Sequence, residues 1–186
     1  MQKTADAQKS MYEDADMFFM KKAVEEARKA LDRKEFPVGC VLVSQGRIIS
    51  SGSRQGTARG GKNETGHAEM IALRRMEEEY PDTDKSGVSL YCTMEPCLMC
   101  YGAALISGIG RIVYAYEDAM GGGTSCDLSR LPPLYRDSPI AVRPGILRQE
   151  SLALFQVFFK DPENDYWKDS LLERYTLEQK CIQFSG

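Results

Sequence analysis

Histidine, tryptophan and long apolar runs are scarce in this sequence of 186 residues. It contains one histidine, His67, and one tryptophan, Trp167, and nowhere do eighteen apolar residues run together. A site built on two or three histidines is therefore excluded, and any nucleophile activated by an imidazole must use His67. The lack of a long apolar run argues against a membrane span. Residues 1–19 have no apolar core typical of a signal peptide, so we expect a cytoplasmic protein.

An excess of basic residues is also absent. Lys and Arg number 24 against 27 Asp and Glu, and the formal net charge is −3. Proteins that bind polyanions usually have a basic surface, but here the densest basic group is only Arg47, Arg54, Arg59 and Lys62. The charge balance favours a small molecule over a nucleic acid as partner, although a local patch could still bind a nucleic acid.

The six cysteines do not suggest a disulfide framework. Without an export signal, free or metal-bound thiols are expected in a chain of this length. Cys40 and Cys92 lie in apolar, strand-like runs, which predicts small buried side chains. Cys97 and Cys100 differ from them, because the spacing Cys-x-x-Cys places two sulfurs on one side of a helical turn.

Alternating helical and extended patterns predict an α/β fold. Helices are expected over 15–31, 67–79, 97–106, 148–159 and 168–178, and strands over 38–43, 47–51, 89–93, 111–116 and 141–142. The first two strands should form a hairpin, and the others should join a largely parallel sheet. We assign residues 1–160 to one domain and 161–186 to a C-terminal extension. The aperiodic loop 52–66 is long enough to be functional.

Three side chains have the chemistry and spacing of a zinc site. His67 and Glu69 form a His-x-Glu motif, and Pro96 precedes Cys97 and Cys100 at the start of a predicted helix. The positive end of that helix favours thiolates. Three protein ligands leave a tetrahedral zinc one ligand short, which is typical of catalytic rather than structural sites. Glu69 could then carry protons to and from a water molecule.

The same motifs also fit a redox protein or a zinc-stabilised scaffold. Cys97 and Cys100 could be a redox dithiol, since Cys-x-x-Cys alone is a weak signal. Alternatively, zinc could stabilise a non-catalytic scaffold or binding protein. A purely structural site has no use for Glu69, so we favour catalysis.

The chain resembles the cytidine deaminase-like superfamily, in the branch of bacterial tRNA adenosine deaminases, guanine deaminases and cytosine deaminases. The matching residues lie at 37–39, 67–69, 93–100, 102–103 and 110–114. The resemblance implies a three-layer α/β/α sandwich around a mixed five-stranded sheet. It also implies zinc on His67, Cys97 and Cys100, Glu69 as proton shuttle, hydrolytic loss of ammonia from a ring amino carbon, and a homodimer.

The chain departs from the tRNA enzymes of this branch in three places. Arg54 follows Gly52-Ser53 where such relatives usually carry a base-reading Asn, and Asn63 is the candidate replacement. Glu117-Asp118-Ala119-Met120 stands where the tRNA enzymes have Arg-Asp-Ala-Lys, so two phosphate contacts would be lost. An acidic, aromatic segment, 161–169, replaces their basic tail. It resembles the tails that close over the pocket in deaminases of small bases, although Trp167 could equally be ordinary packing.

The motifs and the three departures together lead to a specific expectation. The protein should be a zinc-dependent hydrolase that deaminates a free purine or pyrimidine base or nucleoside, with the wobble adenosine of tRNA as the alternative substrate. We expect substrate contacts from eight residues: Pro37, Val38, Arg54, Asn63, Ala68, Glu95, Asp118 and Trp167.

Overall fold

The computed structural model describes residues 2–58, 61 and 63–180, with side chains from residue 13 onward, and contains a five-stranded mixed sheet. The strand order is β2-β1-β3-β4-β5. β1 runs antiparallel to both of its neighbours, and β3, β4 and β5 are parallel. Four strands therefore run one way and β1 runs against them; the opening hairpin and the parallel later strands are as predicted. The strands are β1 (Gly39–Ser44), β2 (Arg47–Ser53), β3 (Val88–Met94), β4 (Arg111–Tyr116) and β5 (Ala141–Arg143).

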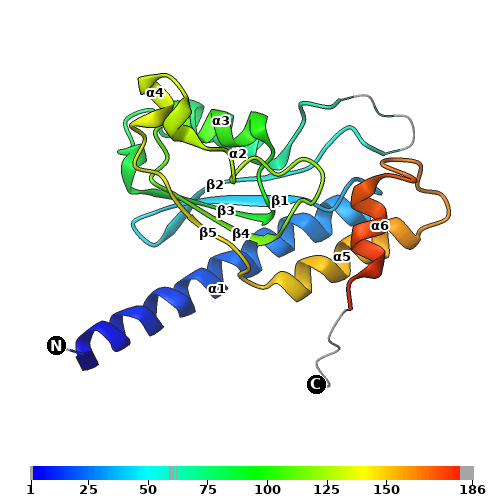
Figure 1. Ribbon diagram of the computed structural model, residues 1–186, viewed down its shortest axis with the longest axis horizontal. Helices are drawn as coiled ribbons and strands as arrows, with labels where there is room; N and C mark the ends of the chain where they lie inside the picture. The colour runs from blue at the N-terminus through cyan, green and yellow to red at the C-terminus, as the bar shows by residue number, and fades with distance from the viewer. Residues whose placement is uncertain (1, 59–60, 62, 181–186) are drawn as a thin grey trace.

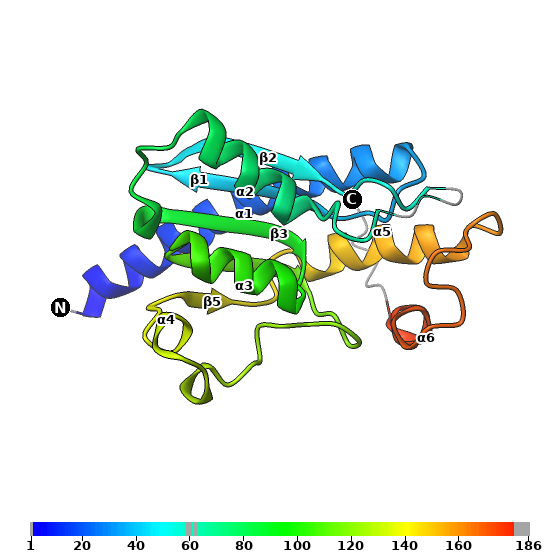
Figure 2. The same cartoon turned by 90° about the horizontal axis from the view of Figure 1, so that it is seen from above.

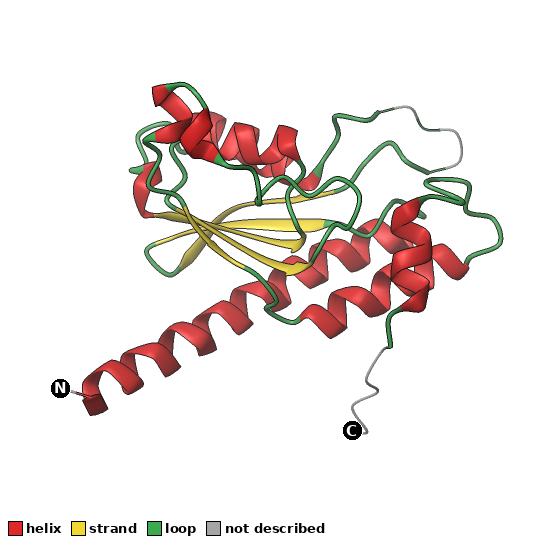
Figure 3. Cartoon of the chain, in the orientation of Figure 1, coloured by secondary structure: helices red, strands yellow, loops and turns green. Residues whose placement is uncertain are grey.

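Helices cover both faces of this sheet (Figure 1; Figure 3). One layer holds α2 (Ala68–Glu79), α3 (Leu98–Ser107) and the short α4 (Pro133–Arg136), and Figure 2 shows α2 and α3 side by side above the strands. The other layer holds α1 (Gln2–Asp32) and α5 (Arg148–Lys160), and α6 (Leu171–Glu178) packs against the end of α5. The predicted three-layer sandwich is confirmed.

The starts of two helices differ by three or more residues from those predicted, and the other predicted helix ends agree to within one residue. α1 begins at Gln2, because the polar segment before residue 15 continues the helix instead of preceding it. α6 begins three residues later than predicted, since the Ser170 side chain accepts a hydrogen bond from the Glu173 backbone N–H at 3.1 Å and caps the helix there. Two 3₁₀ turns, Lys85–Gly87 and Leu128–Arg130, were not predicted.

Alternation along the strands divides the core between the two helical layers. Leu42 and Leu90 belong to the cluster that also contains side chains of α2 and α3, whereas Val41 and Val113 pack with α1. Cys40 and Cys92 are paired in register on β1 and β3 and are fully buried, as predicted for small apolar side chains.

A buried carboxylate fastens α1 to the sheet. Asp16 is 1% exposed, and its two oxygens accept hydrogen bonds from Arg111 on β4, Arg143 on β5 and the Tyr91 hydroxyl on β3. Burial raises the pKa of this carboxyl, but its hydrogen bonds and the two cations outweigh that effect and hold the pKa below the ordinary value. The cluster ties α1 to three strands.

The close contact between β2 and α2 sets where α2 begins. A side chain at Gly52 would place its Cβ 2.2 Å from the Ala68 carbonyl oxygen, so only glycine allows this approach. The first turn of α2 therefore lies against the carboxyl end of β2. None of the helices in the described part of the chain is long and apolar enough to cross a membrane.

Candidate functional site

Two helices begin at one edge of the sheet, and each starts with a residue of the metal motif. His67 is the N-cap of α2 and Cys97 is the N-cap of α3; neither side chain hydrogen-bonds to its own helix end. Cys100 lies in the first turn of α3. The imidazole and the two sulfurs are therefore available to meet beside two helix N-termini, whose partial positive charge favours thiolates.

The three donor atoms converge at distances that suit a tetrahedral ion. Nδ1 of His67 lies 3.6 Å from Sγ of Cys97 and 3.4 Å from Sγ of Cys100. All three atoms lie within 4.8 Å of one another. Zinc bonds of about 2.0 to 2.3 Å place tetrahedral donors about 3.5 Å apart. Within the described ranges, no fourth His, Cys, Asp or Glu joins this group, so the set has one ligand fewer than a closed structural site.

The pKa values of the two cysteine thiols are shifted in opposite directions. The hydrogen bond from the Cys100 thiol, supported by His67, lowers the pKa of Cys97 to about 4. The same hydrogen bond, together with burial, raises the pKa of Cys100 well above its ordinary value. A divalent cation held between the sulfurs would favour the thiolate form of both cysteines.

Glu69 shares the cavity with these donors. It is 3% exposed and comes two residues after His67, in the first turn of α2, where both side chains reach one cavity. Among the buried side-chain oxygens and nitrogens that the structure describes, its Oε2 is the one atom without a hydrogen-bond partner. Burial raises the pKa of this carboxyl. A buried acceptor left unsatisfied is costly, and a catalytic role is one of the explanations for such an atom in a native structure.

The donors open into a cavity of about 280 Å³. Its walls combine apolar side chains with a few polar groups, as is usual for sites that bind small rings. The lining residues are Phe36, Val38, Arg54, Glu64, His67, Glu69, Met94, Glu95, Cys97, Asp118, Met120, Gly121, Tyr166, Trp167 and Leu172.

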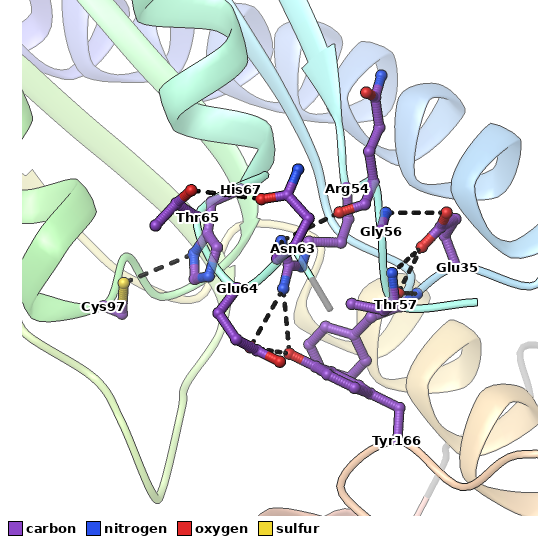
Figure 4. Close-up of polar contacts among 12 residues, drawn as sticks. Glu35, Arg54, Gly56, Thr57, Asn63, Glu64, Thr65, His67, Cys97 and Tyr166 are labelled. Atoms are coloured by element: carbon purple, nitrogen blue, oxygen red, sulfur yellow. Dashed lines mark hydrogen bonds and ion pairs between the residues drawn. The ribbon is translucent and has the colours of Figure 1, made fainter. Parts of the chain in front are cut away.

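Arg54 is the one Lys or Arg side chain among the described residues that line this cavity. The guanidinium is 2% exposed and donates to the carbonyl oxygens of Asn63 and Gln55 and to the Tyr166 hydroxyl. Figure 4 shows Glu64 and Tyr166 meeting at the end of the Arg54 side chain. Arg54 thus connects β2, the loop after it and the C-terminal extension.

Glu35 anchors the start of the same loop. Its carboxylate accepts hydrogen bonds from the backbone N–H groups of Gly56, Thr57 and Ala58 and from the Thr57 hydroxyl (Figure 4). These bonds hold the pKa of Glu35 below its ordinary value despite the opposing effect of burial. The loop is therefore fixed at its beginning by Glu35 and at its end by α2.

Two carboxylates of the cavity wall accept hydrogen bonds from the loop after β4. Glu95 accepts hydrogen bonds from the backbone N–H and hydroxyl of Thr124 and from the backbone N–H of Asp118. Asp118 accepts from the backbone N–H groups of Met120 and Gly121, each at 2.9 Å. Burial raises the pKa of Asp118. Both residues line the cavity, but much of their hydrogen-bonding capacity is used within the fold.

Three of the residues expected to contact substrate do not line the cavity. Phe36 and Val38 do line it, but Pro37 lies at the centre of a tight turn between them, which is closed by the Val38 N–H donating to the Phe36 carbonyl oxygen at 2.8 Å. Asn63 is exposed, and its Oδ1 accepts from Thr65. Ala68 is fully buried with its carbonyl against Gly52. Val38, Arg54, Glu95, Asp118 and Trp167 do line it.

Sequence patterns missed several wall residues. Phe36, Glu64, Tyr166 and Leu172 come from segments that only the tertiary fold brings together. The adjacent aromatics Tyr166 and Trp167 were the one usable signal in the extension. Arg59 and Lys62, the other basic residues of the loop, lie outside the described residues.

Known proteins share this architecture. A family model for the cytidine and deoxycytidylate deaminase zinc-binding region matches residues 13–116. The tRNA-specific adenosine deaminase of Bacillus subtilis is 30% identical over 146 residues, 78% of this chain and 89% of that protein. A solved structure from work on A-to-I editing by tRNA:A34 deaminases is 33% identical, with a TM-score of 0.59, covering 74% of this chain and 98% of that one.

A guanine deaminase from Nitrosomonas europaea has the same fold, with 22% identity and a TM-score of 0.62 over 75% of this chain and 81% of that one. The family match spans more than half of the sequence and includes the converging histidine and cysteines. The chain therefore belongs to the deaminase family that carries the cytidine and deoxycytidylate deaminase zinc-binding region.

Proposed function

We propose that this protein is a zinc-dependent hydrolase that replaces the amino group of a purine or pyrimidine ring with an oxo group. In this reaction a carbon–oxygen bond to water forms, the carbon–nitrogen bond breaks, and ammonia leaves. The proposal depends on one observation above all, the unpartnered Oε2 of Glu69 in the cavity that His67 and Cys97 also line, with Cys100 completing the group of converging donors.

Each of these side chains has a proposed role. His67, Cys97 and Cys100 would hold zinc, which when bound lowers the pKa of a water ligand to about 7. Glu69 would take one proton from the attacking water and pass it to the ring nitrogen, and would then take the proton of the added hydroxyl and pass it to the departing amine. Its burial suits this task, because it raises the pKa of the carboxyl toward pH 7. A carboxyl with such a pKa can both accept a proton and donate it.

A scaffold and a redox dithiol gain less support from the same side chains. A scaffold would have no reason to keep a buried carboxylate oxygen without a partner, since replacing it would remove a desolvation cost. A redox dithiol would not need His67 Nδ1 within 3.6 Å of both sulfurs.

Two substrate classes have separate support. The named relatives support the wobble adenosine of tRNA, and they lend no support to our preference for a small molecule. The chain's own residues favour a free base or nucleoside: Glu117, where the tRNA enzymes have Arg, binds Arg148 and the Tyr175 hydroxyl and is not available to a phosphate. The extension from 161 onward also contributes Tyr166, Trp167 and Leu172 to the cavity wall.

An exposed apolar surface supports a homodimer. Four large apolar side chains on adjoining helices α3 and α4, which we name the α3–α4 face, are exposed: Leu98, Met99, Ile106 and Leu134. Such a patch marks an interaction surface more often than free solvent exposure. We propose that a second copy of the chain covers it.

Zinc content tests the ligand set. We expect about one zinc per chain in the purified protein and a large loss of zinc in Cys100→Ala, because two ligands cannot complete a tetrahedral site. Cys126→Ser, at an exposed cysteine, is the control and should keep the metal. Elemental analysis of the folded proteins provides the measurement, and full zinc occupancy in Cys100→Ala would rule out the proposed set.

Replacing Glu69 tests the proton shuttle. Glu69→Gln should retain zinc and lower the rate of ammonia release about 10²- to 10⁴-fold, since the amide cannot take up the proton. Glu78→Gln, on the exposed side of α2, should leave the rate unchanged. Ammonia release from a panel of amino-heterocycles gives the rate. Turnover of Glu69→Gln at the wild-type rate would contradict the assigned role.

Direct competition tests the substrate class. A tRNA anticodon stem-loop with adenosine at the wobble position, free bases and nucleosides should be offered at equal concentration to the zinc-loaded protein. If the small-substrate proposal holds, bases or nucleosides release ammonia faster and tRNA binding is weak. Efficient inosine formation with salt-sensitive tRNA binding would instead assign the protein to the tRNA class.

Light scattering tests the dimer. We expect a mass of two chains for the wild type and one chain for Ile106→Glu, because a buried unpaired carboxylate at an interface is costly. Val157→Glu, at an equally exposed apolar position on α5, is the matched control and should remain dimeric. A monomeric wild-type protein would exclude the proposal.

A further inference from the structure

The buried guanidinium of Arg54 is incompletely neutralised. The carboxylate paired with it, that of Glu64, lies 3.6 Å from Nη2 and is 64% exposed, whereas Arg54 is 2% exposed. The other contacts of Arg54 are two carbonyl oxygens and Tyr166, whose hydroxyl accepts from Nη2 and whose ring centroid lies 5.9 Å from Cζ; these groups are all uncharged. A buried cation without a close carboxylate is unfavourable unless another group completes its shell.

The same chain pairs its other semi-buried arginines closely. Arg111 and Arg143 donate to the buried Asp16 at 2.6 and 2.7 Å, and Arg148 forms a two-pronged contact with Glu117. Arg54 is the exception, and it is also the arginine in the wall of the cavity that holds His67 and Glu69. An electron-rich group of a ligand could therefore provide the close hydrogen-bond acceptor that the protein does not give Arg54.

The charges around Arg54 limit the kind of ligand. Glu64, Glu69, Glu95 and Asp118 also line the cavity, so carboxylates outnumber the guanidinium. A phosphate would be repelled by these groups at short range. A neutral carbonyl oxygen accepts from a guanidinium without that penalty, and Glu64 can accept an N–H from the same ring.

We propose that Arg54 and Glu64 determine substrate specificity by reading a carbonyl oxygen and an adjacent N–H of the ring that loses its amine. This rests on the proposed deaminase function. Arg54 donates to the oxygen and Glu64 accepts from the nitrogen, while the Tyr166 hydroxyl, bonded to both, holds the pair in place. The preferred rings bear an oxo group beside a ring N–H, as guanine does. Adenine offers ring nitrogens but no carbonyl.

Turnover of matched rings tests the pair. The zinc-loaded wild type should deaminate guanine at least about tenfold more efficiently than adenine, since a polar group left unpaired in a buried site weakens binding by this order. Arg54→Asn should abolish most of that preference. Arg75→Asn, at an exposed arginine of α2 outside the cavity, is the control and should keep it. An unchanged guanine-to-adenine ratio in Arg54→Asn would overturn the proposal.

Binding separates this proposal from the deaminase function. Calorimetry on zinc-loaded Glu69→Ala measures ring affinity without turnover, and guanine should bind at least about tenfold more tightly than adenine. Glu64→Gln should also reduce the preference for guanine over adenine. Because this variant keeps the buried Arg54, it still tests the pair if Arg54→Asn does not fold. If guanine binds selectively but the wild type releases no ammonia, the proposed deaminase function is refuted and the specificity pair is not. Equal binding of both rings, or binding of neither, would refute the specificity pair.

Discussion

The direction of strand β1 is the constraint on which the site depends. Because β1 runs against both neighbours, β2, β3 and β4 all end at one edge of the sheet, and β1 begins there. Ligands in open α/β sheets gather at such an edge. Val38 precedes β1, Arg54 follows β2, Glu95 follows β3 and Asp118 follows β4, and all four line the cavity. The helices that follow β2 and β3 both begin at this edge. This brings His67 together with Cys97 and Cys100, although the two segments are about thirty residues apart in the sequence.

The site contains buried polar groups that lack full partners and so destabilise the fold, and well-paired polar groups elsewhere in the chain offset this cost. Glu69 keeps a buried oxygen unpartnered, and Arg54 keeps a buried charge weakly neutralised. Elsewhere polar groups are closely satisfied: Asp16 joins α1 to three strands, and Glu35 accepts four hydrogen bonds from one loop. Unsatisfied polar groups are tolerated where the surrounding structure holds them rigidly, and this distribution is typical of a preorganised binding site.

Local features could be predicted from the sequence, and surfaces formed between distant segments could not. Periodicity located every strand, the Cys-x-x-Cys spacing within one helical turn placed Cys97 and Cys100 together, and the His-x-Glu motif assigned His67 to the same site. The cavity wall is different. Tyr166 reaches it because α5 and its following loop return to the start of β1, and no local pattern encodes that contact. Asn63 was predicted as a base-reading amide, but the backbone of the loop presents its carbonyl to Arg54 instead.

Arg54, Glu117 and the C-terminal extension form one structural unit. Arg54, at the end of β2, donates to Tyr166 in the extension, and Glu117, after β4, accepts from Tyr175 of α6. The extension also inserts Leu172 into the core and the cavity wall. Replacing Arg54 by an amide or Glu117 by a cation would therefore break a contact with the extension. Because these residues and the extension contact one another, the effects of changing them should not be additive.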